Sequence, residues 1–340
     1  MHALPFAFCA LFFAGDSDAA PPESPEAARA AVVKSLQFLA KDSVDWKEEH
    51  KCASCHHVPM TIWALEEGRQ AGYAVETAVL DQLTTWVLTD GQARVLPDLE
   101  HKNPFNPTIE MAGVYTMLAL GARSTWDDAA RAAWNRVATH VVATQIPDGS
   151  VPSGVGRPPI FERAEALTAY AVLALTPPER EAAQLNNVRT ARANAVRWLA
   201  ETPGSGAHQS RVLRLLVDTR TDGDADRIQA EAASLIQLQE KDGGWRQTAQ
   251  IAPDALATGQ SLFALHAAGV PPSHDAVRRG VSFLVRTQAE NGSWPMASRP
   301  TFEQQPEGAG ATSLRPITAA GSAWGALGLI RSVAKGVRPE

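Results

Sequence analysis

The feature that most constrains the fold of this chain is a helical unit that recurs along its 340 residues. Runs rich in Ala and Leu return about every 45 to 65 residues and are apolar nearly all round, which is typical of helices buried in a core. These runs begin at His57, Glu110, Glu165, Gln209, Asp254 and Thr318. The segments between them are amphipathic, with one charged face, and cover residues 25–41, 75–89, 126–145, 179–201, 224–239 and 274–288.

Six buried segments therefore alternate with six amphipathic ones, and no segment has the pattern of a strand. Two concentric layers satisfy this alternation, with the buried helices inside and the amphipathic helices outside. We expect an all-α fold, an (α/α)6 toroid, as a single domain over residues 21–340. An open superhelix of helical pairs is the structural alternative, and it would need polar capping repeats at its ends.

The connections between the expected helices are unequal in length. Long connections follow most of the outer helices and cover residues 42–56, 90–107, 146–161, 240–253 and 289–316. In a ring of parallel inner helices they gather at one rim, where we expect the functional site. Glu110, Glu165 and Asp254 are the candidate catalytic residues there, although each also suits a helix cap or an ion pair. The same rim receives Glu162, Arg163, Arg211, Thr258 and Arg315.

Composition and motifs exclude several classes of function. The net charge is −6 and no basic face is indicated, so we expect no nucleic-acid partner. Three cysteines are too few for a scaffold held together by disulfides. The fingerprints of nucleotide-binding loops, dinucleotide-binding folds, zinc proteases and serine hydrolases do not occur.

The N-terminus resembles a targeting segment. Residues 3–14 form one apolar run, too short to span a bilayer and about as long as the core of a signal peptide. We expect residues 1–20 to be a signal peptide, which makes the protein periplasmic or secreted and removes Cys9. The alternative is an apolar tail, and no other segment is long and apolar enough to cross a membrane.

Two of the long connections open with the same motif. Gln239-Glu-Lys-Asp-Gly-Gly-Trp245 and Gln288-Ala-Glu-Asn-Gly-Ser-Trp294 both have the pattern Q-x-x-[DN]-G-x-W, and Gln145 begins a third copy that ends in Val151. The pattern resembles the QW repeat of the squalene-hopene cyclase and protein prenyltransferase families. This resemblance implies an α/α toroid, with Asp-Gly or Asn-Gly turning the chain and Trp stacking on Gln.

This sequence retains only some of the residues that carry the chemistry of those cyclases. The family's protonating motif is D-x-D-D-T, and the best match here starts at Asp254 and ends at Thr258, with Leu256 and Ala257 in place of the central carboxylates. Aromatic residues on the inner helices are either core or, as the resemblance implies, the lining of a cavity for a lipid-like molecule. They are Trp63, Tyr115, Tyr170, Phe263 and Trp324.

The most specific chemical motif is Lys51-Cys52-Ala-Ser-Cys55-His56-His57. C-x-x-C-H is the attachment pattern of c-type haem, in which Cys52 and Cys55 bond the haem and His56 ligates the iron. The other axial ligand is left open among His57, Met111, His101 and His140.

Other interpretations of this motif remain open. Cys52, Cys55 and His56 or His57 also suit a zinc site, and the two cysteines alone suit a redox pair or a disulfide. We expect an exported cyclase-like toroid whose haem serves redox chemistry or electron transfer, with a redox partner protein or a lipid-like substrate. The alternatives are a zinc-dependent or cofactor-free relative of terpene cyclases and prenyltransferases, and a binding scaffold without catalysis.

Overall fold

The structure is a computed structural model that describes residues 23–50, 56–91, 107–153, 158–177, 185–297 and 314–333. Within these ranges the inner helices are α2 (His57–Gln70), α6 (Pro107–Gly121), α8 (Ala164–Ala174), α10 (His208–Arg220), α12 (Ala255–Ala267) and α14 (Arg315–Ser332). The outer helices are α1 (Pro25–His50), α3 (Thr77–Trp86, continued by a π-helical turn at Val87–Gly91), α7 (Asp128–Thr144), α9 (Asn186–Glu201), α11 (Ala225–Gln237) and α13 (Asp275–Thr287). None of these helices is long and apolar enough to cross a membrane.

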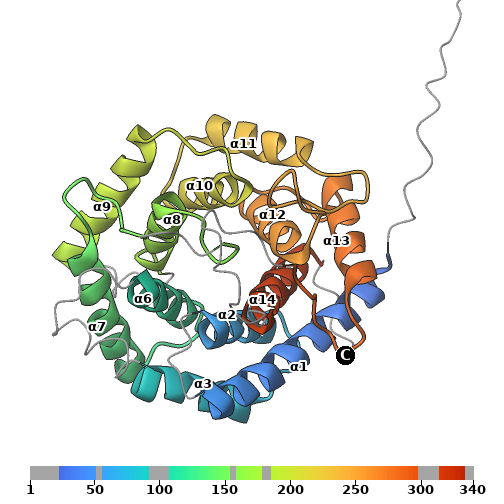
Figure 1. Ribbon diagram of the computed structural model, residues 1–340, viewed down its shortest axis with the longest axis horizontal. Helices are drawn as coiled ribbons and strands as arrows, with labels where there is room; N and C mark the ends of the chain where they lie inside the picture. The colour runs from blue at the N-terminus through green and yellow to red at the C-terminus, as the bar shows by residue number, and fades with distance from the viewer. Residues whose placement is uncertain are drawn as a thin grey trace, which may run out of the picture.

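The helices form two concentric rings, which confirms the predicted all-α toroid (Figure 1). Each inner helix packs against the next inner helix along the chain. The rings close where α14 packs against α2 and where α13 packs against α1. Because the last helices contact the first ones, the fold is a closed toroid and not an open superhelix.

The two rings differ in how their helices are buried. In α12 every residue from Ala255 to Leu265 is buried, as an inner position requires. In α13 the buried residues include Ala276, Gly280 and Phe283, spaced by three and four, and they form a single stripe facing inward. The sequence pattern therefore assigns each helix to its ring.

Helices α12 and α14 cross at very close range. A Cβ atom on Gly259 would lie 2.1 Å from the carbonyl oxygen of Trp324, and one on Gly328 would lie 2.7 Å from the carbonyl oxygen of Gly259. The two backbones meet with no side chain between them, so glycine is required at these positions.

The three Q-x-x-[DN]-G motifs act as clamps between successive outer helices. Each Gln side-chain amide donates one hydrogen bond to a carbonyl in its own turn and a second to the next outer helix. The second acceptors are Ala191 in α9 for Gln145, Ala276 in α13 for Gln239 and Ala31 in α1 for Gln288, at 2.8, 2.8 and 2.9 Å. The last of these clamps joins the final outer helix to the first and so closes the ring.

The final residue of each motif is held by an inner helix. The backbone N–H of Trp245 donates to the hydroxyl of Thr258, and that of Trp294 donates to Ser322, both at 3.0 Å. Each indole Nε1–H donates to a carbonyl near the end of the preceding outer helix, at 2.8 and 2.9 Å. In the two complete motifs the Gln side chain therefore bridges backbones, and the Trp is anchored by its own hydrogen bonds.

The first outer helix is longer than predicted. It continues to His50, so most of the expected connection 42–56 is helical. Asp42, Trp46 and Glu49 fall on one face at helical spacing, and that face contacts α2 and α14. The contacts of this face with α2 and α14 accompany the extension of the helix beyond residue 41.

Candidate functional site at the rim between α1 and α2

The two predicted histidines lie at the start of α2, next to the end of α1 and the start of α14. Cys52 and Cys55 lie outside the described residues. Glu110 belongs to α6, and its side chain also falls outside what the structure describes. The geometry of the site therefore rests on the histidines and on the residues around them.

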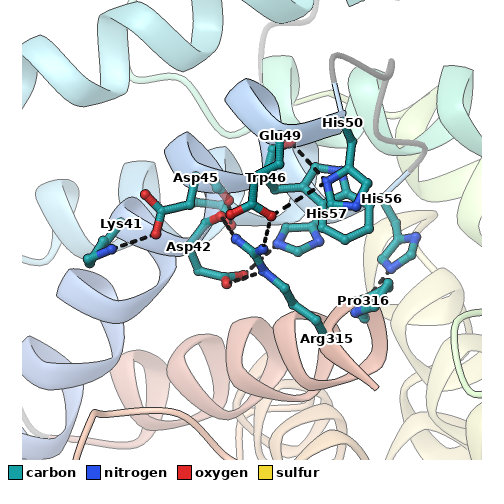
Figure 2. A network of polar contacts seen from close by, with 12 residues as sticks. Lys41, Asp42, Asp45, Trp46, Glu49, His50, His56, His57, Arg315 and Pro316 are labelled. Carbon is teal, nitrogen blue, oxygen red and sulfur yellow. Dashed lines mark hydrogen bonds and ion pairs between the residues drawn. The ribbon is translucent and has the colours of Figure 1, made fainter. Parts of the chain in front are cut away.

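His57 is held by a carboxylate that is itself held by an arginine (Figure 2). Its Nε2 lies 2.6 Å from Oδ2 of Asp42, and Oδ1 of Asp42 accepts a hydrogen bond of 2.7 Å from Nε of Arg315. Burial alone would raise the pKa of Asp42, but the hydrogen bonds and charges of His57 and Arg315 hold it below its usual value. Asp42 is therefore an ionised acceptor.

The indole ring of Trp46 packs against the other side chains of this cluster. Its ring stacks on His50 at a centroid distance of 3.7 Å and on His57 at 4.6 Å. The guanidinium of Arg315 lies 5.5 Å from the centroid of Trp46 and also pairs with Glu49 at 2.6 Å. Contacts from α1, α2 and α14 thus converge on one imidazole.

The hydrogen bonds define the tautomer of His57. A carboxylate only accepts, so Nε2 carries the proton that bonds Asp42, and Nδ1 of a neutral ring keeps its lone pair. Nδ1 is buried and has no hydrogen-bond partner among the described residues. A ligating histidine commonly donates its other ring N–H to a carboxylate in this way.

His56 is buried next to the start of α14. Its Nε2 lies 3.1 Å from the carbonyl oxygen of Pro316. Burial, together with the nearby His57, lowers the pKa of His56 to about 4. His56 is therefore a neutral imidazole at ordinary pH, the form that binds metals.

Two of the candidate catalytic carboxylates have structural partners. Glu165 is buried, pairs with Nε of Arg214 and accepts the backbone N–H of Ser205 at 3.1 Å. Burial would raise the pKa of Glu165, but these hydrogen bonds hold it below its usual value. Glu165 is therefore an ionised partner of Arg214 and a poor proton donor.

Asp254 caps α12. Its Oδ1 accepts the backbone N–H of Ala257 at 2.9 Å, and its Oδ2 accepts the side-chain amide of Gln247 at 2.7 Å. Thr258, which matches the end of the cyclase motif, uses its hydroxyl to hold the backbone of Trp245. Both matching residues of that motif therefore have structural tasks.

The axial-ligand candidates are scattered. His140 lies in the outer helix α7, where its ring packs against Gly113 of α6. Met111 is buried in α6, and His101 lies outside the described ranges. Among the residues that the structure describes, no three His, Cys, Asp or Glu side chains form a metal-binding group.

Aromatic side chains cross the axis of the toroid. Tyr170 on α8 and Trp324 on α14, the opposite inner helix, have ring centroids 6.5 Å apart. The hydroxyl of Tyr170 accepts a hydrogen bond of 3.1 Å from Gln260 on α12, and Tyr115 and Trp324 also contact that hydroxyl. At this level side chains from opposite inner helices reach one another across the axis.

Sequence reasoning missed Asp42, Trp46 and Pro316 as site residues. A signal for the first two existed in the i, i+4, i+7 spacing with Glu49, which continues the amphipathic face beyond residue 41. Pro316 contributes a backbone carbonyl, which no side-chain pattern could have revealed.

Comparison with known proteins places a cyclase-like region in the second half of the chain. Residues 205–303 match the family described as squalene-hopene cyclase C-terminal domain. A segment of 82 residues is 40% identical to a squalene–hopene cyclase of Bradyrhizobium diazoefficiens, covering 21% of this chain and 12% of that relative. The family match spans α10 to α13 and both complete QW motifs. It agrees with the squalene-cyclase-like toroid that the fold displays.

Proposed function

We propose that this chain is an exported toroid with a redox centre at the rim between α1 and α2. In this proposal Cys52 and Cys55 bind haem c covalently and His56 ligates the iron, for electron transfer or for oxidation of an apolar, lipid-like molecule. The observation that carries the proposal is the state of His56, a buried neutral imidazole directly after the cysteine pair.

The described residues fit such a group in their donor chemistry. His56 donates Nε2–H to a backbone carbonyl, which is a common outer contact of ligating histidines. His57, Asp42 and Arg315 form a rigid wall beside it. Haem bound there would supply one-electron redox chemistry; the chain would orient it and exclude water.

The contacts of the candidate carboxylates and of the aromatic residues at the axis argue against polyprene cyclisation. Protonating an alkene needs a strong, well-placed acid, yet Arg214 helps to hold Glu165 in its ionised form, and Asp254 uses its two oxygens to cap α12 and to bind Gln247. The aromatic residues that cross the axis occupy the region where a cyclase would hold its substrate. A cyclase-like fold with a different chemistry accounts for both facts.

The decisive measurement is an absorption spectrum of the full chain expressed in a periplasm with haem-attachment enzymes. We expect a Soret band and a haem-stained band that survives denaturing electrophoresis. Replacing Cys52 and Cys55 together by Ala should abolish the stained band, and the matched control Cys9→Ala should keep it. A folded protein without haem in both tests would contradict the proposal.

Zinc is a second candidate because of the contact between Asp42 and His57. The carboxylate–histidine pair is a recurrent outer shell of zinc sites. Cys52, Cys55 and one or both of His56 and His57 would then be the ligands. Stoichiometric zinc, measured by elemental analysis and lost in Cys52→Ala, would favour this candidate; a haem band with no zinc would exclude it.

A further inference from the structure

A continuous series of aromatic contacts runs inward from the proposed centre. Ring centroids are 6.4 Å apart from His56 to Tyr115, 5.2 Å from Tyr115 to Tyr170, 6.5 Å from Tyr170 to Trp324 and 5.2 Å from Trp324 to Trp63. The five rings belong to four inner helices or their ends. Each step joins two rings whose centroids lie within the range usual for aromatic pairs in proteins.

The series leads from one rim of the toroid towards the other. Trp63 lies six residues beyond His57 in α2, which is a shift of about 9 Å along the helix. Trp63 contacts Phe263 at 5.7 Å, and the guanidinium of Arg331 lies 5.5 Å from the Phe263 ring. Arg331 pairs with Glu67 near the other end of α2, at 2.6 Å.

The residues in this series differ in how they can be oxidised. Indole and phenol are the aromatic side chains that lose an electron most readily. An indole radical cation can keep its N–H proton, whereas a phenol must lose its proton to a base. The hydroxyl of Tyr170 forms hydrogen bonds with Gln260, Tyr115 and Trp324, none of which is a base. Burial, together with the charge of Glu162, raises the pKa of Tyr170 well above the usual value. The indoles are therefore the sites where a positive charge can rest, and the tyrosines bridge to them.

We propose that Tyr115, Tyr170, Trp324 and Trp63 form an electron path that leads from the rim centre towards the opposite rim. This inference rests on the proposed redox function. One electron passes per event. Trp324 would supply that electron to a centre oxidised by a peroxide-class oxidant, Trp63 would then reduce Trp324, and a reductant from solution would restore Trp63. No bond forms or breaks within the path, and the indoles keep their protons.

Packing alone also explains buried aromatic residues. The test must therefore measure a quantity that a purely structural role would leave unchanged. A thiol-reactive ruthenium polypyridyl photo-oxidant is attached to Cys55 in the full chain, with Cys9 and Cys52 replaced by Ser. Trp46, which stacks on His57 at the rim, is replaced by Phe in every variant so that it does not supply the radical. A cobalt(III) ammine accepts the electron of the excited label irreversibly. The oxidised label then stands in for the centre, and transient absorption follows the tryptophan radical.

We expect a tryptophan radical to form as the oxidised label is reduced. Trp324→Phe should abolish it, whereas Trp134→Phe, which changes an equally buried tryptophan of the outer helix α7, should leave it unchanged. Trp63→Phe should keep the radical on Trp324 and slow its reduction by ascorbate from solution. Circular dichroism and urea midpoints check that each variant folds.

The proposal is overturned if Trp324→Phe leaves the radical yield unchanged, or if Trp134→Phe lowers it equally. It is also overturned if the oxidised label persists with no tryptophan radical, or if Trp63→Phe leaves the ascorbate reaction unchanged. Because the label supplies the oxidant, a protein without haem would contradict the proposed function and leave this measurement intact.

Discussion

His140 provides a test of how burial controls the protonation of this fold. Its side chain is 4% exposed, and neither ring nitrogen has a hydrogen-bond partner among the described residues. Burial lowers the pKa of His140 from 6.5 to about 4. Replacing it by Leu, which is similar in size, removes the titrating group and leaves no polar partner unsatisfied.

The size of the effect follows from the two pKa values. Between pH 6.5 and 4 the unfolded chain binds a proton at His140 and the folded chain does not, so acid favours unfolding. Between pH 8 and pH 5 this group costs the folded state about 2 kcal/mol. His56 and His208 carry the same direction of shift, each to about 4, so the unaltered protein should lose about 6 kcal/mol over this interval if the three act independently.

The assay is urea unfolding followed by circular dichroism at pH 8 and pH 5. At pH 8 His140→Leu should be as stable as the unaltered protein or more so. The loss on going to pH 5 should be about 2 kcal/mol smaller in the variant. If the two proteins lose the same free energy, His140 is charged or hydrated in the folded state and the burial argument is refuted.

Three further predictions concern the scaffold. Gly259→Ala places a Cβ 2.1 Å from a backbone carbonyl of α14 and should lower the free energy of unfolding, measured thermally, by about 3 kcal/mol or more. The control Gly121→Ala, whose Cβ meets nothing closer than 3.8 Å, should lower it by less than about 1 kcal/mol. Equal losses in the two variants would contradict the close crossing. Gln288→Ala loses two amide hydrogen bonds and should lower the free energy of unfolding in urea by about 2 kcal/mol. Proteolysis should become faster where α13 meets α1. An unchanged urea midpoint would show that the clamp contributes nothing. Asp254→Ala removes a helix cap and should lower the free energy of unfolding by about 1 to 2 kcal/mol. Asp254→Asn keeps a capping oxygen and should retain both stability and any haem spectrum. Loss of function in a stable Asn variant would instead identify Asp254 as a proton donor.

The QW motifs separate local from tertiary information. The Asp-Gly or Asn-Gly turn is visible in the sequence, because glycine at positive φ has few substitutes; Gly243 and Gly292 have φ of 90° and 87°. The acceptors of the Gln amides are backbone carbonyls on the next outer helix, far along the chain. No sequence pattern marks them, so the clamping role of Gln288 became visible only in the closed ring.

The candidate site divides in the same way. The sequence placed His56 and His57 together beside two cysteines, because adjacency along the chain is a local property. It could not reveal that Asp42 orients His57, since that contact depends on α1 continuing to His50 and on Arg315 arriving from the last helix.

By itself the sequence determined the alternation of buried and amphipathic helices, and with it the toroid, because hydrophobic periodicity follows from the residues of each segment alone. Only the tertiary structure decided which polar residues serve structure and which remain for chemistry. In the sequence Asp254 and Glu165 suit catalysis, a helix cap or an ion pair; in the structure their oxygens accept hydrogen bonds from a helix end and from an arginine. Arg214 reaches Glu165 only when α10 packs against α8, whereas the cap at Asp254 is a contact between residues close along the chain.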